Sequence, residues 1–131
     1  MDASACPLEP AADPAGITVV RLRRRSEFLA AARGVRLGRA AYLLQARARR
    51  EPERATVVGI GFTVTRKIGN AVTRNRARRR LREAARLLLP GPARPGVDYV
   101  VVARPLALSQ PFQALRDDLA AAFAQIGPRA R

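Results

Sequence analysis

The sequence predicts an α+β fold: a two-layer sandwich in which a mixed sheet of about four strands packs against three helices, in the order α-β-β-α-β-α. Three observations predict it: an alternating β-branched run at residues 55–65, an amphipathic helical pattern over 71–89, and a second apolar run at 97–104. A strand, a helix and a strand in that order form a crossover between parallel neighbours. Helices packed on one face of such a sheet give two layers.

The chain is expected to hold one folded domain. Its 131 residues suit a single core, and 48% of them are hydrophobic. Residues 1–16 contain three prolines and many alanines without any period, which predicts a flexible N-terminal tail. The domain is expected to span 17–127, and 128–131 to form a basic C-terminal tail.

Cysteine usage and hydropathy favour a reducing compartment away from membranes. Cys6 is the single cysteine, so no disulfide can form within the chain. No apolar run approaches the roughly 20 residues that span a bilayer. The N-terminus lacks the positive flank and apolar block of a signal peptide. We therefore expect a cytoplasmic protein with no membrane partner, and nothing in the sequence indicates an obligate protein partner.

A short first helix is predicted over Ser26–Arg33. Ser26 is a good N-cap residue, Glu27 complements the positive end of the helix dipole, and Gly34 is typical of a helix end. The apolar residues between them fall at helical spacing: Phe28, Leu29 and Ala32.

Two strands follow, and we expect them to pair as an antiparallel hairpin. The first covers Ala41–Arg47 and the second Ala55–Thr65, and a charged turn at 49–54 joins them. The second strand alternates apolar residues with small or polar ones, so one face is expected in the core. These two sets are Ile60, Phe62 and Val64 against Gly61, Thr63 and Thr65.

The second half of the chain predicts two longer helices around a buried strand. The first of these helices covers Ala71–Leu89, and the prolines and glycine at 90–92 end it. Its apolar residues form one stripe: Ala77, Leu81, Ala84, Ala85 and Leu88. The strand is Val97–Arg104, and the last helix is Ser109–Ile126, with Pro111 in its first turn. The stripe of that helix is Phe112, Leu115, Leu119, Ala122, Phe123 and Ile126.

Positive charge is the strongest functional signal. The formal net charge is +15, and residues 66–86 carry nine Lys or Arg against one acid, Glu83. A sequence pI of about 11.9 is typical of a nucleic-acid binder. Along the helix, arginines repeat at i,i+4, where like charges repel: Arg74, Arg78, Arg82 and Arg86. A bound polyanion would relieve that repulsion, whereas a plain solvated face usually mixes charge signs.

The same sequence argues against a hydrolytic site made of protein side chains. It contains no histidine, the commonest general base and metal ligand. One cysteine cannot build a Cys-rich zinc site. Among ten scattered acids only Asp117 and Asp118 are adjacent, and neighbours on a helix point about 100° apart. We therefore expect no metal site and no catalytic residue in the protein itself.

Four polar or aromatic residues are open to two interpretations from the residues alone. Asn75 could read a base edge or make a local bond within the helix. Phe28 could stack on an unpaired base or belong to the core of a short amphipathic helix. Thr63 and Thr65 could contact a ligand or simply reflect strand propensity.

Two adjoining motifs resemble those of a known family. They are Gly61-Phe62-Thr63-Val64-Thr65-Arg66-Lys67 and Gly69-Asn70-Ala71-Val72-x-Arg74-Asn75-Arg76-x-Arg78-Arg79-x-Leu81-Arg82-Glu83. In content and in their place after a strand, they are similar to the protein subunit of bacterial ribonuclease P. The order of helices fits as well, so the resemblance covers roughly residues 19–126.

The resemblance implies a protein that binds a large catalytic RNA and the 5′ leader of precursor tRNA. The RNA holds the catalytic Mg²⁺ ions, and no organic cofactor is implied. The fold implied is like that of ribosomal S5 domain 2, with an unusual left-handed βαβ crossover. Residues matching the RNA-facing positions are Arg66, Lys67, Arg74, Asn75, Arg76, Arg78, Arg79 and Arg82. Residues matching the leader cleft are Phe28, Thr63 and Thr65, while the place of a second aromatic is taken by Ala32.

The same features give less support to three other functions. The alternative is a ribosomal or other structural RNA-binding protein without a nuclease role. The missing histidines disfavour a nuclease that acts without RNA. A reader of duplex DNA is disfavoured because Leu81 and Leu88 commit one side of the basic helix to the sheet.

Overall fold

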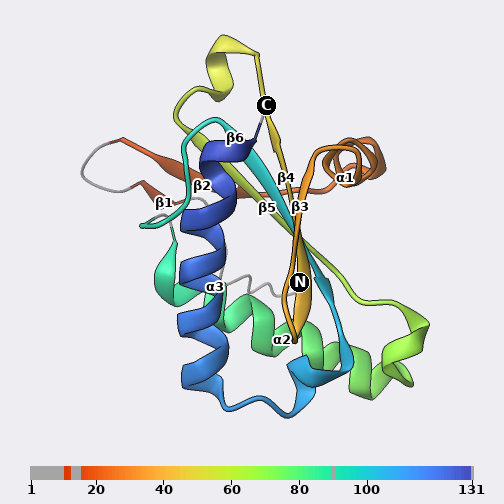
Figure 1. The fold of residues 1–131 in the computed structure, drawn as a ribbon. Coiled ribbons are helices and arrows are strands. Elements are labelled where there is room, and N and C mark those ends of the chain that lie inside the picture. The colour runs from red at the N-terminus through yellow and green to blue at the C-terminus, as the bar shows by residue number, and fades with distance from the viewer. Residues whose placement is uncertain (1–10, 13–15, 90, 131) are drawn as a thin grey trace.

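The computed structural model describes residues 11–12, 16–89 and 91–130 and confirms the α+β class (Figure 1). The helices in this part of the chain are α1 (Arg25–Ala32), α2 (Ala71–Leu88) and α3 (Phe112–Ile126). The strands are β1 (Ala11–Ala12), β2 (Thr18–Arg21), β3 (Val35–Gly38), β4 (Tyr42–Ala48), β5 (Val57–Thr63) and β6 (Val97–Ala103). Short 3₁₀ turns are η1 (Pro52–Arg54), η2 (Arg66–Ile68), η3 (Pro105–Leu108) and η4 (Gly127–Arg129).

The mixed sheet is larger than predicted. It has six strands in the order β1-β2-β5-β6-β4-β3, against an expectation of about four. The three strands located from the sequence are β4, β5 and β6. The others have two to four residues, too few for alternation to stand out from the arginines around them. β1 falls within the predicted N-terminal tail, whose remaining residues 1–10 and 13–15 lie outside the described part of the chain.

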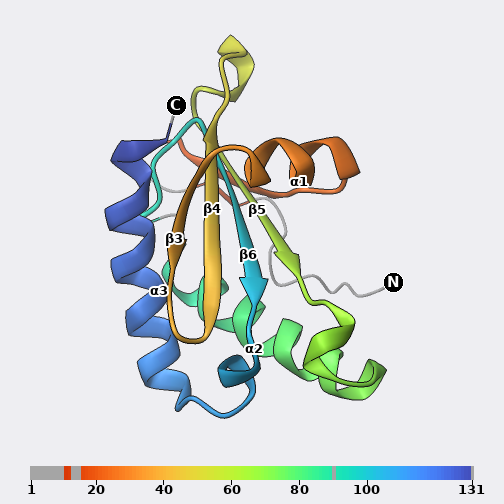
Figure 2. The ribbon, with the colours of Figure 1, turned by 45° about the vertical axis from the view of Figure 1, so that its right-hand side comes forward.

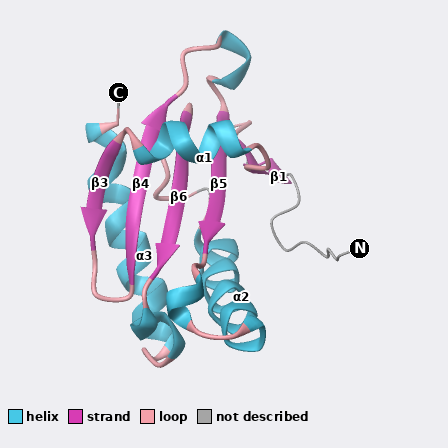
Figure 3. Ribbon diagram, turned by 90° about the vertical axis from the view of Figure 1, so that its right-hand side faces the viewer, coloured by secondary structure: helices cyan, strands magenta, loops and turns pink. Residues whose placement is uncertain are grey.

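The predicted hairpin between β4 and β5 is wrong. β6 lies between them, antiparallel to β4 and parallel to β5 (Figure 3). The reason is burial: six of the seven residues of β6 are buried, and such a strand belongs in the middle of a sheet. The charged connection after β4 therefore passes the end of β6 before the chain enters β5.

The crossover from β5 through α2 to β6 joins parallel neighbours, as predicted. Gly59 pairs with Asp98 and Thr63 with Val102. The crossover is left-handed, as the family resemblance implied, and so runs against the general preference for right-handed units (Figure 3).

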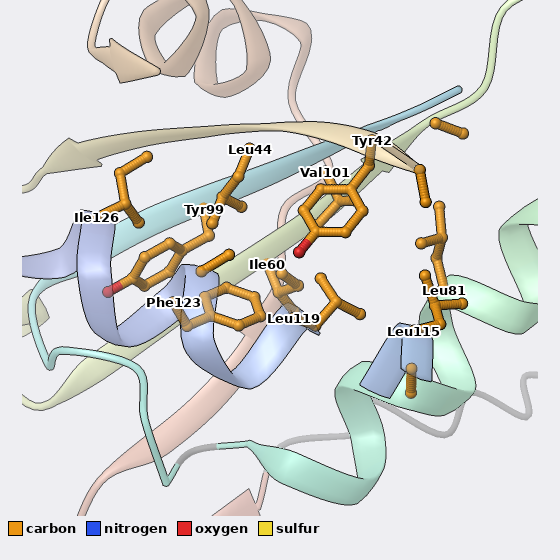
Figure 4. Packing of buried hydrophobic residues seen from close by; sticks show 14 of the residues in the cluster. Tyr42, Leu44, Ile60, Leu81, Tyr99, Val101, Leu115, Leu119, Phe123 and Ile126 are labelled. Carbon is orange, nitrogen blue, oxygen red and sulfur yellow. The ribbon is translucent and has the colours of Figure 1, made fainter. Parts of the chain in front are cut away.

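Helices cover both faces of the sheet, which corrects the expectation that all three share one face. α2 and α3 pack on one face over the main core (Figure 4), and α1 lies on the opposite face (Figure 2). Residues of β6 alternate between them: Tyr99 and Val101 join the main core, while Val100 packs with Leu22 and Ala31. An eight-residue helix such as α1 carries too little pattern to show which face it covers.

The helix ends differ from prediction where local hydrogen bonds decide them. Arg24, not Ser26, is the N-cap of α1. The Oε1 atom of Glu27 accepts hydrogen bonds from the backbone N–H groups of Arg23 and Arg24 at 3.2 and 3.1 Å. That acceptor satisfies otherwise unpaired donors at the helix start, so the helix begins earlier than a serine cap would place it.

The two longer helices are close to prediction. α2 begins as expected, because the Oδ1 atom of Asn70 accepts a hydrogen bond from Thr73 N–H at 2.9 Å. Gly69 before it has φ +147°, a region that favours glycine. α3 starts at Phe112 with Pro111 as its N-cap, because the preceding residues form η3 instead. Both apolar stripes lie against the core as predicted.

Candidate nucleic-acid interface

The exposed side of α2 is basic because its opposite side is buried. Ala77, Leu81, Ala84 and Ala85 are all fully buried. Five of the predicted RNA-facing residues therefore lie on the helix sides that point away from the core: Asn75, Arg76 and Arg79 exposed, Arg74 and Arg78 half-buried. Arg82 is also half-buried, one turn further along the helix. Arg66 and Lys67 are exposed in η2, just before α2, where the buried Ile68 anchors the turn.

Local bonds hold some of these side chains in place. Arg78 Nη1 donates to Asn75 Oδ1 at 2.9 Å, so Asn75 makes a bond within the helix and leaves its amide N–H₂ toward solvent. Arg86 Nε donates to Glu83 Oε1 at 2.7 Å on the same exposed surface. A guanidinium that is already oriented loses less side-chain entropy when it binds phosphate.

Arg80 has a different role from its neighbours. The sequence groups it with the other arginines of the polar side, yet its Nε donates to Ala107 O at 2.8 Å and its Nη2 to Gln110 O. Both acceptors are backbone carbonyls in and after η3. Arg80 therefore joins α2 to the segment before α3 and is not available as a phosphate ligand.

Several further arginines make ion pairs or hydrogen bonds that stabilise the fold. Arg39 pairs with Asp118 of α3 at 2.5 Å, and Arg104 Nη1 donates to the carbonyl of Arg39 at 2.8 Å. Arg49 and Arg54 pair with the buried Asp98. The basic residues of the chain thus have different roles. Within the described part of the chain, Arg74, Arg76, Arg78 and Arg79 of α2 form no ion pair with a carboxylate.

A hollow of about 330 Å³ lies on the exposed side of α2. The described residues that line it are Val72, Asn75, Arg76 and Arg79. Val72 is 77% exposed, the most of any large hydrophobic residue in the described part of the chain. An apolar side chain among guanidinium groups can contact the face of a base while the arginines bind phosphate.

A second hollow of about 480 Å³ lies where α1, β5 and α2 meet. Its lining residues are Arg23, Arg25, Phe28, Leu29, Phe62, Thr63, Val64 and Arg78. We call this hollow the cleft. It brings together Phe28 and Thr63, two of the three predicted cleft residues. Thr65 is exposed beyond the end of β5 and is not among the lining residues.

Phe28 serves both the core and the cleft. A Cβ atom at Gly61 would lie 2.6 Å from Cε1 of Phe28, so the ring rests directly on the bare backbone of β5. The same side chain is half-buried, packs against the small core under α1 and lines the cleft. Glycine at this strand position permits the close approach of the aromatic ring.

An ion-pair network beside the cleft was missed by sequence reasoning. The side chain of Asp98 in β6 is 2% exposed, and Arg49 and Arg54 bind its two oxygens at 2.7 and 2.9 Å. Arg49 also pairs with Glu51 at 2.7 Å and with Glu27 of α1 at 3.3 Å. The signal in the sequence is the single acid inside the apolar strand, because a buried charge needs partners.

The charges in this network shift each other's protonation. Hydrogen bonds from the Arg49 guanidinium to Asp98 and Glu51 raise the pKa of Arg49 above its ordinary value. Burial acts to raise the pKa of Glu27, but the hydrogen bonds from Arg24 and Arg23 N–H and from Arg49 outweigh it and lower the pKa. Both shifts favour the charged forms of Arg49 and Glu27.

The described residues form neither a metal-binding cluster nor a membrane-spanning helix. Residues 11–12, 16–89 and 91–130 contain no group of three or more His, Cys, Asp or Glu side chains placed to hold a metal ion. No helix in the same part of the chain is long and apolar enough to cross a membrane.

Comparisons with known proteins agree on one family. A family model described as Ribonuclease P matches residues 18–127. The ribonuclease P protein component of Ruegeria pomeroyi is 52% identical over 112 residues, covering 85% of this chain and 87% of that protein. The ribonuclease P protein component of Caulobacter vibrioides is 50% identical over 103 residues, covering 79% of this chain and 68% of that protein.

Solved structures show the same fold. The RNase P protein from Thermotoga maritima has a TM-score of 0.67 and 28% identity, covering 82% of this chain and 97% of that one. The RNase P protein of Staphylococcus aureus has a TM-score of 0.65, covering 85% of this chain and 97% of that one. At 20% identity this second likeness concerns the fold alone.

Two adjacent arginines of α2 should differ in their effect on stability. Arg80→Ala removes hydrogen bonds from a charged donor to two carbonyls and should lower the free energy of unfolding by about 2 kcal/mol. Arg79→Ala alters an exposed side chain and should change it by less than about 0.5 kcal/mol. Urea unfolding of both variants measures the difference. Equal losses would contradict the structural role given to Arg80.

Proposed function

The chain belongs to the ribonuclease P protein family, and from this premise we propose that it binds both the catalytic RNA and the 5′ leader of precursor tRNA. Membership makes it a subunit of a ribonuclease and a partner of the ribonuclease P RNA. The reaction we propose is endonucleolytic removal of the leader in the cytoplasm, which leaves the mature 5′ end of the tRNA. The observation that carries this proposal is the cleft between α1, β5 and α2, which adjoins the arginine side of α2.

The arginine side of α2 is proposed to bind the catalytic RNA. The residues assigned to it are Arg66, Lys67, Arg74, Asn75, Arg76, Arg78, Arg79 and Arg82. Arginine binds phosphate through two parallel hydrogen bonds, and each neutralised phosphate releases counterions. Repulsion between arginines one turn apart falls when RNA phosphates lie between them. The helix is thus more stable in the complex than alone.

The cleft is proposed to bind the single-stranded leader. Phe28 lines the cleft with a ring that rests on the backbone at Gly61, and an unstacked base can pack against this ring. Thr63 offers a hydroxyl, and Arg78 reaches the cleft from α2 with a guanidinium for a leader phosphate. We assign Thr65 to the mouth of the cleft, because its neighbour Val64, directly after β5, is a lining residue. Ala32 supplies no second aromatic, so Phe28 carries the stacking.

Catalysis is proposed to rest with the RNA and the Mg²⁺ ions that it binds. The carboxylates near the cleft are occupied by arginines: Glu27 and Asp98 share Arg49. Asp118 of α3, the neighbour of Asp117, pairs with Arg39 from the turn between β3 and β4. Carboxylates held in this way are poor general bases, because arginine N–H groups already occupy their oxygen lone pairs. The protein side chains therefore bind and orient the two RNAs.

Removing two arginines from the proposed RNA-binding side should weaken binding to the catalytic RNA. For Arg76→Ala with Arg79→Ala, the slope of log K against log salt should fall in magnitude by about 1.5, because each phosphate contact contributes about 0.7 to 0.9. Titration of the RNA at several salt concentrations measures the slope. Arg33→Ala with Arg116→Ala removes the same charge from the C-cap of α1 and from α3 and serves as the control. Equal slopes for the two double variants would refute the assignment of this side of α2.

Removing the ring of Phe28 should affect only substrates that carry a leader. Phe28→Ala should weaken binding of precursor tRNA to the holoenzyme by about 1 to 3 kcal/mol, the range for one stacked base. Binding of mature tRNA should hardly change. Phe112→Ala, which truncates a half-buried ring packed in the main core, is the control. If Phe28→Ala weakened both tRNAs equally, a core role alone would explain the residue.

A further inference from the structure

Five charged side chains on the α1 side of the sheet form a network that the proposed RNA contacts do not use. Asp98 binds Arg49 and Arg54, and Arg49 binds Glu51 and Glu27 as well. Two of them, Arg49 and Glu51, stand in the connection from β4 to β5, and η1 holds Arg54. Asp98 is in β6 and Glu27 in α1. The network thus links three separate parts of the chain.

Arg49 is the centre of this network. Its Nη1 atom lies 2.7 Å from Asp98 Oδ2 and 3.3 Å from Glu27 Oε2, and its Nε atom lies 2.7 Å from Glu51 Oε1. The planar guanidinium can satisfy three carboxylates only in one orientation. Because Asp98 is almost fully buried, loss of its partners would leave an uncompensated charge. The position of Arg49 is therefore tightly determined.

Glu27 links Arg49 to the part of α1 that lines the cleft. Its Oε2 atom accepts a hydrogen bond from Arg49, and its Oε1 atom accepts the N–H groups of Arg23 and Arg24, the two residues directly before α1. Phe28 follows Glu27 directly, and Arg23 and Phe28 both line the cleft. The first turn of α1 is thus held at its carboxylate by a residue from the connection that follows β4. Figure 3 shows α1 lying across β4, β6 and β5 at this place.

Two glycines of β5 make room for this arrangement. A Cβ atom at Gly59 would lie 2.3 Å from Asp98 Oδ1, and one at Gly61 would lie 2.6 Å from the ring of Phe28. Residues two apart on a strand face the same side. The buried carboxylate and the aromatic ring therefore rest on successive positions of one strand face.

We infer that Arg49 is a positioning residue that sets the angle of α1 over β5 and so holds Phe28 in place for the leader. The inference rests on the proposed function of the cleft. Arg49 itself lies outside the cleft, since it is not among its lining residues. It acts through Glu27, and its loss should loosen the first turn of α1 while leaving the arginine side of α2 unchanged.

The test is the ratio of dissociation constants for mature and precursor tRNA in the reconstituted holoenzyme. Arg49→Gln should lower this discrimination about three- to tenfold, the range expected for a residue coupled to a site through others. Affinity for the catalytic RNA should stay within about twofold. Arg39→Gln breaks the Arg39–Asp118 pair at α3 and should leave the discrimination unchanged. Unchanged discrimination in Arg49→Gln, or an equal loss in Arg39→Gln, would overturn the inference.

Two further variants separate positioning from a general loss of stability. Glu27→Gln keeps an oxygen for the N–H groups of α1 but loses the charge that binds Arg49, so it should reproduce a smaller loss even if Arg49→Gln folds poorly. In a Phe28→Ala background, Arg49→Gln should have little further effect on discrimination, because the residue acts through that ring. Fully additive losses would contradict the inference.

The same experiment distinguishes this inference from the proposed function. If Phe28→Ala retains full discrimination, the leader assignment of the cleft itself is wrong. If Phe28→Ala loses discrimination and Arg49→Gln and Glu27→Gln keep it, the cleft binds the leader and only the positioning role of Arg49 fails.

Discussion

The packing of α2 against the sheet is the constraint on which the rest of the structure depends. Ala77 and Leu81 are fully buried, and Arg80 holds the same helix to η3 through two backbone carbonyls. Burial of one side forces the remaining arginines onto the other, where they repel one another. A fold that concentrates charge in this way is stable because hydrophobic burial exceeds that repulsion, and its free surface attracts polyanions. The family to which the chain belongs works with such a polyanion, the ribonuclease P RNA.

The opposite face of the sheet is built on small residues. Gly59 and Gly61 leave the middle of β5 without side chains on the side of α1, so a buried carboxylate and an aromatic ring can approach the backbone. The two faces of the sheet, with α1 on one and α2 and α3 on the other (Figure 2), therefore differ. The large apolar core lies under α2 and α3, whereas a smaller core, the cleft and the ion-pair network lie on the side of α1. The left-handed crossover brings α2 close enough for Arg78 to line that cleft as well.

Patterns of sufficient length predicted the fold well. The stripes of α2 and α3 and the strands β4, β5 and β6 could be read from periodicity, because each covers seven or more residues. Strand order could not, since pairing of β4 with β6 depends on contacts far apart in sequence. The roles of individual arginines could not be predicted either. No local pattern distinguishes Arg80, which is bonded to backbone carbonyls, from the exposed Arg79. The family resemblance assigned Phe28 and Thr63 to one cleft, whereas spacing alone left the role of each residue open. Neither the resemblance nor the spacing revealed the ion pairs of Asp98.

The central claim is that this chain binds RNA and leaves the chemistry to its RNA partner. The most direct measurement is 5′ cleavage of precursor tRNA at low Mg²⁺ by the full chain alone, by a bacterial ribonuclease P RNA alone, and by both together. We expect no cleavage by the chain alone and strong stimulation of the RNA when the chain is added. Cleavage by the protein in the absence of RNA, or failure to stimulate its cognate RNA, would contradict it.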